Sequence, residues 1–452
     1  MTLIAKRPAG AAGPAKRAST RTIYSSPEGG TVRRTVLPGG LRVVTEKMPG
    51  ARSVAFGIWV GVGSVDETPA QTGAAHYLEH LLFKGTKTRS AWELSAVIDE
   101  VGGEMNAFTS KEHTCYYATM LASDLPLGVE IVSDVVLNPT MRTEDIDIER
   151  YVVLEELAMR DDDPSDLVHD VFAETMFGSR PIGRPIIGDA EHIGAIGRRQ
   201  ISSLYRRHYR PENMVVTAAG DVDHAELTRL VRKAFGEVLA DASPLSVRRS
   251  SHRPLSVPAS PVSVVNRRSE QAHLVLGVPG IDRFDERRFA MSVLETALGG
   301  GMSSRLFQEI RERRALAYTV YAFSSLFAGD GMFGVYAGTA PANAPKVVEL
   351  IQQQLAEVAA DGLSEAEVAR AIGQVRGSLV LGLEDPGARM SRLGRSELGY
   401  ADHADVAWLL EQIESVTASD VAELASDVLS RPQCLAVVGP FREGSFDTLM
   451  VS

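Results

Sequence analysis

Two Asp-Pro pairs, Asp163-Pro164 and Asp385-Pro386, each end a predicted helix, and they lie 222 residues apart in a chain of 452. Proline lacks the N–H that a helix interior needs, and it disfavours helical backbone at the residue before it. Residues 239–261 lie between the pairs, are rich in Ser, Pro and Arg, and show no hydrophobic period, which is typical of a linker. The order of predicted elements starts again after this linker. The sequence therefore predicts two similarly built domains.

Strands and helices alternate without strict strand–helix–strand units, which indicates an α+β fold. In the first half we predict strands at Thr31–Leu37, Leu41–Thr45, Ser53–Gly61, Glu104–Ser110 and His113–Leu121, and helices at Thr72–Phe83, Ser90–Val101, Asp124–Leu137 and Thr143–Asp162. In the second half we predict strands at His273–Val278, Tyr318–Leu326 and Gly331–Gly338, and helices at Asp285–Leu298 and Ser303–Arg314, followed by two more. The predicted organisation is a disordered basic tail (1–30), a first domain (31–238), the linker (239–261) and a second domain (262–452).

Composition excludes several classes of protein. Lys and Arg number 47 against 58 Asp and Glu, and the net charge of −11 argues against a general binder of nucleic acid or anionic membranes. The two cysteines, Cys115 and Cys434, are too few for a disulfide framework or a Cys-based zinc module. A metal site in this chain must therefore use His, Asp or Glu.

Targeting signals are the next constraint. No apolar run approaches the ~18 residues that a membrane-spanning helix needs, and the N-terminus lacks the apolar stretch of a secretory signal. We therefore expect no membrane span and a cytoplasmic location. The basic, acid-poor start of the chain is also compatible with a mitochondrial transit peptide, although Pro8 and Pro14 interrupt any helix there. The mitochondrial matrix is the alternative location.

The segment His76-Tyr77-Leu78-Glu79-His80 carries the strongest chemical signal. On a helix, residues i and i+4 lie on one face, so both imidazoles can reach one ion. Catalytic zinc needs three protein ligands and an open position for water, and a neighbouring carboxylate such as Glu79 can accept the proton of that water. The pattern predicts a metal centre, although a solvated helix face would have the same sequence.

A third ligand is expected from the helix Thr143–Asp162, which supplies Glu149, Glu155 and Glu156. This helix also carries valines typical of a packed face, and a carboxylate buried beside them is costly unless it is paired or metal-bound. From these residues alone, each of the three glutamates is a candidate. A His/His/Glu set suits zinc, and it also accepts cobalt or manganese.

The segment HYLEHLLFKGT (76–86) resembles the signature of the inverted-motif zinc peptidases, the pitrilysin and mitochondrial-processing-peptidase family. The likeness is closest to bacterial single-chain members of processing-peptidase size and covers nearly the whole chain after residue 30. It implies that His76 and His80 bind one Zn²⁺ per chain and that Glu79 is the general base. The family's third ligand follows its second histidine by 76 residues, which is Glu156 here, and its supporting carboxylate matches Glu149. This spacing disfavours Glu155.

Residues Asn106, Ala107, Phe108 and Thr109, which follow Gly102-Gly103, resemble the family's substrate-binding edge strand. Independently of the family, an edge strand offers free N–H and C=O groups, so an extended peptide can add to it as another strand. Such binding depends little on side chains, which suits a peptidase of broad specificity. The alternative interpretation is an ordinary strand after a helix that ends at Gly-Gly.

The second half carries Arg311 and Tyr318 in the segment RERRALAY, which resembles the family's Arg/Tyr pair. The resemblance implies that both contact the substrate backbone and the developing oxyanion, for which a guanidinium and a phenol are suitable donors. Without the family, Arg311 would be interpreted as a solvated helix residue. No His-x-x-Glu-His follows residue 261, and a shift of 222 residues aligns Glu156 with Ser378. The second domain is therefore expected to lack the metal.

The resemblance implies an α+β fold of two homologous domains, each with a mainly antiparallel sheet covered by helices. It also implies a zinc-dependent endopeptidase that hydrolyses unfolded peptides or presequence-like segments. Because the family's complete chamber has four such domains, we expect a homodimer; a heterodimer with a metal-less homologue is the alternative. The rival functions are a non-catalytic scaffold, such as a core subunit of a larger complex, and an amidohydrolase acting on small molecules.

Overall fold

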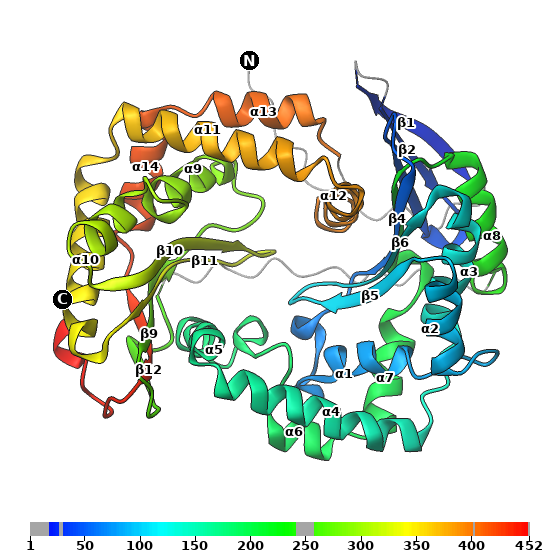
Figure 1. The fold of residues 1–452 in the computed structure, drawn as a ribbon, viewed down its shortest axis with the longest axis horizontal. Coiled ribbons are helices and arrows are strands. Elements are labelled where there is room, and N and C mark those ends of the chain that lie inside the picture. The colour runs from blue at the N-terminus through cyan, green and yellow to red at the C-terminus, as the bar shows by residue number, and fades with distance from the viewer. Residues whose placement is uncertain (1–17, 27–29, 241–256, 401–402, 451–452) are drawn as a thin grey trace. The chain divides into compact units, whose positions relative to one another are not determined.

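The computed structural model describes residues 18–26, 30–240, 257–400 and 403–450. The chain forms two compact units, each built on one β-sheet (Figure 1). Unit 1 contains residues 1–155, 186–248 and 382–405, and unit 2 contains residues 156–185, 249–381 and 406–452. Among the described residues, every helix is too short or too polar to span a lipid bilayer.

The sheet of unit 1 has seven strands in the order β1-β2-β3-β7-β4-β6-β5. Its strands are β1 Ser19–Ser25, β2 Thr31–Val36, β3 Arg42–Lys47, β4 Ser53–Val60, β5 Glu104–Thr109, β6 Thr114–Leu121 and β7 Met214–Gly220. The pair β3/β7 is parallel and the other neighbours are antiparallel. The strands predicted at Thr31–Leu37 and Leu41–Thr45 are present as β2 and β3, which pair antiparallel, and β5 lies at the edge of the sheet, paired with β6.

Helices cover both faces of this sheet. The helices that begin in unit 1 are α1 Ala74–Leu82, α2 Ala91–Glu100, α3 Leu125–Leu137, α4 Thr143–Asp162, α6 Ala190–Ala195, α7 Arg198–His208, α8 His224–Ala240 and α12 Pro386–Gly399. On one face Phe56 and Ile58 of β4 pack in a core with α1, α3 and α8. On the other face Trp59 packs with Met390 and Leu393 of α12. Burial on both faces explains why every residue of β7 is buried.

The sheet of unit 2 has five strands in the order β10-β11-β9-β12-β8, and its β8/β12 pair is the parallel one. Its strands are β8 Val262–Asn266, β9 Ala272–Pro279, β10 Ala317–Leu326, β11 Gly331–Thr339 and β12 Cys434–Gly439. Its helices are α5 Pro164–Phe177, α9 Arg288–Gly299, α10 Ala344–Asp361, α11 Glu365–Gly382, α13 Val406–Glu414 and α14 Ala418–Val428. Five strands of unit 1, β3-β7-β4-β6-β5, repeat this pattern of pairing, and the predicted α+β fold is confirmed.

The two Asp-Pro pairs begin helices as well as ending them. Asp163 and Asp385 accept backbone N–H groups as the N-caps of α5 and α12, and each proline occupies the first turn. Each helix packs in the unit opposite to its neighbours in the chain: α5 contacts β9 and β12, and α12 contacts β3, β4 and β7 (Figure 1, orange helix beside the blue strands). The predicted division at 239–261 placed α5 in the first domain and α12 in the second. Local sequence does not specify which sheet a helix covers.

Two further details differ from the prediction. Residues 18–26, predicted to belong to a disordered tail, contain β1, which pairs with β2; that part of the prediction was wrong. Two threonines, an isoleucine and a tyrosine in β1 are residue types that suit a strand. The rest of the predicted tail that lies in 1–17 and 27–29 is outside the described residues. The helix predicted over Ser303–Arg314 contains a π-helix, Phe307–Glu312, and this π-helix carries Arg311.

Candidate metal centre

Helix α1 presents the inverted motif because its other face is fixed in the core. Tyr77, Leu78 and Leu81 are buried, and the Tyr77 hydroxyl donates to the backbone carbonyl of Ile146 on α4. Burial raises the pKa of Tyr77 to about 12, so the hydroxyl remains a donor at neutral pH. The side chains of His76, Glu79 and His80 lie on the other side of the helix and are consequently turned away from the core.

A buried acid, Glu67, caps the N-terminus of α1, and sequence reasoning missed it. Its Oε1 accepts the N–H of Ala75 at 2.7 Å and its Oε2 accepts the N–H of Gly73 at 3.0 Å. Gly73 has φ 85°, and a Cβ there would lie 2.8 Å from the carbonyl oxygen of Ile187. A carboxylate at a helix N-terminus satisfies donors that the helix itself leaves free. Glu67 precedes Gly73 by six residues, which is further than the residue spacing of a local helix cap.

Three side chains converge at the exposed face of α1. Ligand atoms of His76, His80 and Glu156 all lie within 4.8 Å of one another, and each residue is partly buried. The two imidazole rings lie 4.7 Å apart between centroids at an angle of 67°. Glu156 is on α4, which continues without a break from the segment bonded to Tyr77. Glu155, one residue earlier on that helix, is exposed and is not part of the cluster.

The protonation of His76 suits a cation. Burial, with a smaller contribution from His80, lowers the pKa of His76 to about 4, so His76 is neutral at neutral pH. A neutral imidazole has the lone pair that a metal requires. Two imidazoles and one carboxylate are a donor set that zinc accepts, and a set of three leaves a coordination position for water. The residues present therefore fit a catalytic zinc ion.

Glu149 lies behind the cluster, with only 2% of its side chain exposed. Its Oε2 is 3.2 Å from Nδ1 of His80, and its Oε1 is 2.6 Å from Nζ of Lys84. Because the carboxylate accepts at Nδ1, the lone pair of His80 is on Nε2. Glu149 thus orients a candidate ligand, as the second layer of a metal site does.

Glu79 faces the end of the edge strand. The hydroxyl of Thr109, the last residue of β5, donates to Oε2 of Glu79. Along β5 the side chains alternate: Phe108 packs edge-on against Trp59 with centroids 5.6 Å apart, Ala107 packs on the opposite core, and Asn106 is exposed. The structure therefore brings the predicted base next to one residue of the predicted substrate strand.

Arg311 and Tyr318 are neighbours within unit 2. The Arg311 guanidinium carbon lies 4.8 Å from the centroid of the Tyr318 ring and 4.7 Å from that of Phe307. Stacking between a guanidinium and two rings limits the orientations of Arg311. Tyr318 is 74% exposed, which is unusual for an aromatic residue on a strand. The pair thus presents two donors at the surface of unit 2.

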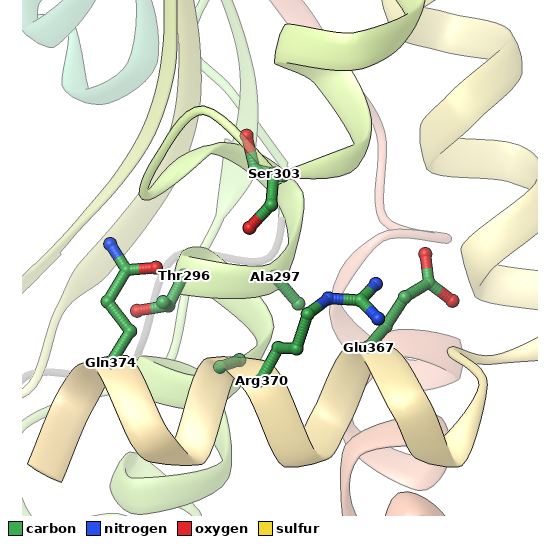
Figure 2. Close-up of a pocket in the computed structure, with 8 residues that line it drawn as sticks. Thr296, Ala297, Ser303, Glu367, Arg370 and Gln374 are labelled. Carbon is green, nitrogen blue, oxygen red and sulfur yellow. The ribbon is translucent and has the colours of Figure 1, made fainter.

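The glycines at the end of α9 have a structural role. Gly300 is the C-cap of α9, and a Cβ at Gly299 would lie 2.1 Å from the backbone nitrogen of Ala322. The neighbouring hollow between α9 and α11 is lined by Thr296, Ala297, Ser303, Ser304, Glu367, Arg370, Ala371 and Gln374 (Figure 2). Gln374 donates to the Gly300 carbonyl at 2.5 Å, and Glu367 accepts from Arg305 at 2.9 Å. These bonds hold Gln374 and Glu367 in the packing between the two helices, and we assign the hollow no site.

Comparison with known proteins places this geometry in a family. Residues 42–190 match the family described as "Insulinase (Peptidase family M16)", and residues 195–375 match the one described as "Peptidase M16 inactive domain". An uncharacterized zinc protease of Streptomyces coelicolor is 53% identical over 431 residues, covering 94% of each chain. The chain belongs to peptidase family M16. The predicted resemblance to the inverted-motif zinc peptidases is confirmed.

A more distant relative and two solved structures also match over nearly their whole length. The uncharacterized zinc protease YmxG of Bacillus subtilis is 34% identical over 409 residues, covering 90% of this chain and 98% of its own. Among solved structures, a protease from Helicobacter pylori superposes with a TM-score of 0.82 at 21% identity, covering 95% of this chain and all of its own. A Pseudomonas fluorescens structure described as a peptidase M16 inactive domain has a TM-score of 0.80 at 18% identity, covering 94% of this chain and 98% of its own. At these identities the solved structures establish the fold.

Proposed function

We propose that this M16 protein is a zinc-dependent endopeptidase that hydrolyses unfolded peptides or presequence-like segments. The observation that carries the proposal is the convergence of His76, His80 and Glu156, with Glu79 on the same helix face. The names of its relatives as zinc proteases support the same class of reaction. A scaffold protein would have no need to retain all four residues.

Each residue of the site has its own role in the proposed hydrolysis. When bound by His76, His80 and Glu156, zinc supplies a Lewis acid that makes water more acidic and polarises a peptide carbonyl. Glu79 accepts the proton of the attacking water and returns it to the leaving amine. Thr109 donates to Oε2 of Glu79, which holds this carboxylate beside the edge strand.

The proposed substrate lies along Asn106–Thr109 of the β5 edge as an added strand. Support comes from the place of β5 at the end of the sheet, where no further strand of the described residues pairs with its outer edge. The bond from Thr109 to Glu79 ties this edge to the proton acceptor. Recognition through backbone requires an extended, unfolded segment and tolerates many side chains.

Removal of the metal is expected to abolish cleavage. A quenched peptide library is incubated with purified protein, with protein treated with 1,10-phenanthroline, and with treated protein to which zinc is returned. We expect cleavage by the untreated protein, loss of cleavage to background after treatment, and recovery when zinc is returned, because two imidazoles and one carboxylate provide no hydrolytic chemistry without the ion. One zinc per chain without any peptide cleavage would contradict the proposal and favour a scaffold. Cleavage restricted to small amides would favour an amidohydrolase.

We further propose that the active form is a homodimer in which Arg311 and Tyr318 of one subunit serve the metal domain of the other. The stacked, exposed pair supports this role, since its donors are free of the hydrophobic core. Light scattering combined with size exclusion is expected to give twice the chain mass for the fraction that cleaves peptide. A fully active monomer would contradict the shared site, and activity that appears only with a metal-less homologue would indicate a heterodimer.

A further inference from the structure

We propose that Lys84 is a positioning residue of the metal centre, which acts through Glu149 on His80. The three form a chain: Nζ of Lys84 lies 2.6 Å from Oε1 of Glu149, and Oε2 of Glu149 lies 3.2 Å from Nδ1 of His80. The inference rests on the proposed function only in taking zinc as the ion that His80 binds.

The backbone fixes where Lys84 can reach. Lys84 follows His80 by four residues, and its N–H donates to the carbonyl of Leu81 at 3.2 Å, which continues the turn beyond the end of α1. Gly85 then has φ 126°, and the Thr86 hydroxyl donates to Asp134 at 2.6 Å. The segment after the motif is therefore held at both ends, and it carries the ammonium group back toward α4.

Burial makes this ion pair more than a surface contact. Among the described residues, the hydrogen bonds and ion pairs of the Glu149 carboxylate are with Lys84 and His80. An ionised carboxylate that is 2% exposed needs a compensating charge close by. Without Lys84, the carboxylate would lose that compensating charge and the contact at its Oε1. It would then be able to rotate away from His80 and toward solvent.

Such a rotation would disturb the candidate ligand. A carboxylate that accepts from Nδ1 keeps the His80 ring in one orientation and one tautomer, with Nε2 available to the ion. A rotated Glu149 would no longer hold the Nδ1 proton. We therefore assign Lys84 the task of keeping Glu149 aimed at His80, so that the site is arranged before zinc binds.

The test measures zinc affinity, not turnover. Zinc is titrated against a chromophoric chelator with wild-type protein, Lys84→Met, Lys84→Arg, Glu149→Gln and the double variant Lys84→Met/Glu149→Gln. Lys84→Met is expected to weaken zinc binding about 10- to 100-fold, the usual effect of losing an outer partner of a ligand. Lys84→Arg keeps the charge and is expected to restore most of the affinity. The double variant is expected to bind zinc no more weakly than Glu149→Gln alone, because Lys84 acts through that carboxylate.

Lys87→Met is the matched control, since Lys87 is an exposed lysine three residues further whose backbone bonds to Asn138. It is expected to bind zinc as the wild type does. Far-UV circular dichroism of the zinc-free proteins checks folding, and Lys84→Gln replaces Lys84→Met if the latter does not fold. Unchanged affinity in both neutral variants, or additive losses in the double variant, would overturn the role of Lys84 alone. A wild type that binds no zinc would overturn the proposed function as well.

Discussion

Replacing Glu79 by glutamine is expected to lower kcat/KM for peptide cleavage by at least 100-fold, while zinc affinity and the fold are retained. Glutamine has the shape of glutamate, and its amide oxygen can still accept from Thr109. It cannot accept the proton of the attacking water, and a positioned general base contributes about 10²–10⁴-fold to a rate. The measurement pairs initial rates on a quenched peptide with zinc titration of the same preparation.

Glu155→Gln provides the control for this experiment. Glu155 is an exposed glutamate next to the Glu156 ligand candidate, so its replacement makes the same chemical change close to the site. It is expected to leave both cleavage and zinc binding unchanged. If Glu79→Gln kept more than a tenth of wild-type activity, Glu79 would not be the base. If Glu79→Gln lost zinc, its role would be in the metal site itself.

The local part of the site was predictable because it depends on helix geometry. The spacing of His76 and His80 places them on one face, and α4 has the bounds predicted from its pattern and its Asp-Pro end. The residues alone did not separate Glu155 from Glu156. These positions differ by about 100° around the helix, and the separation came from the family spacing. In the structure, Glu156 belongs to the cluster and Glu155 is exposed.

The contacts that complete the site depend on segments brought together by the fold. Thr109 bonds to Glu79, which is 30 residues away in the sequence, and Glu149 bonds to His80, which is 69 residues away. Contacts at such sequence separations cannot be recognised from local residue spacing. The packing of α5 in unit 2 and of α12 in unit 1 is a similar case. Cap residues indicate where a helix begins, but they do not indicate which sheet the helix covers. One signal was present: the apolar run of β7 indicates a strand buried on both faces, and such a strand needs a helix on each side.

A buried charge network attaches α12 to the sheet of unit 1. Glu397 on α12 has no exposed side-chain surface; it accepts from Nε and Nη2 of Arg34 at 2.7–3.0 Å, and Arg42 lies 3.8 Å away. Nε2 of His403 lies 2.6 Å from Oε2 of Glu397, to which Nε of Arg34 also donates. These hydrogen bonds and positive charges outweigh burial, which alone would raise the value, and lower the pKa of Glu397 to about 2.

Glu397→Gln is expected to destabilise unit 1 by about 3 kcal/mol at neutral pH. Removing one partner of a buried pair leaves Arg34 and Arg42 without their counter-charge, which typically costs ~3–5 kcal/mol. Urea unfolding is followed by the fluorescence of Trp59, a buried residue against which Gly394 of α12 packs, in a background with the other two tryptophans replaced by Phe. Glu226→Gln, which breaks an exposed pair with Arg229, is the control and is expected to have no measurable effect.

The pH dependence of this difference tests its electrostatic origin. The folded pKa of Glu397, about 2, lies below the ordinary value of 4.5, so the unfolded state binds the proton more readily. The stabilisation is therefore fully present above about pH 5, declines as the pH falls from 4.5 toward 2, and vanishes below both values. In the glutamine variant this position does not titrate, so the free energies of unfolding of the wild type and the variant are expected to converge in acid. A difference that stayed constant from pH 7 to pH 3 would mean that packing of α12, and not the charge of Glu397, is what the substitution removes.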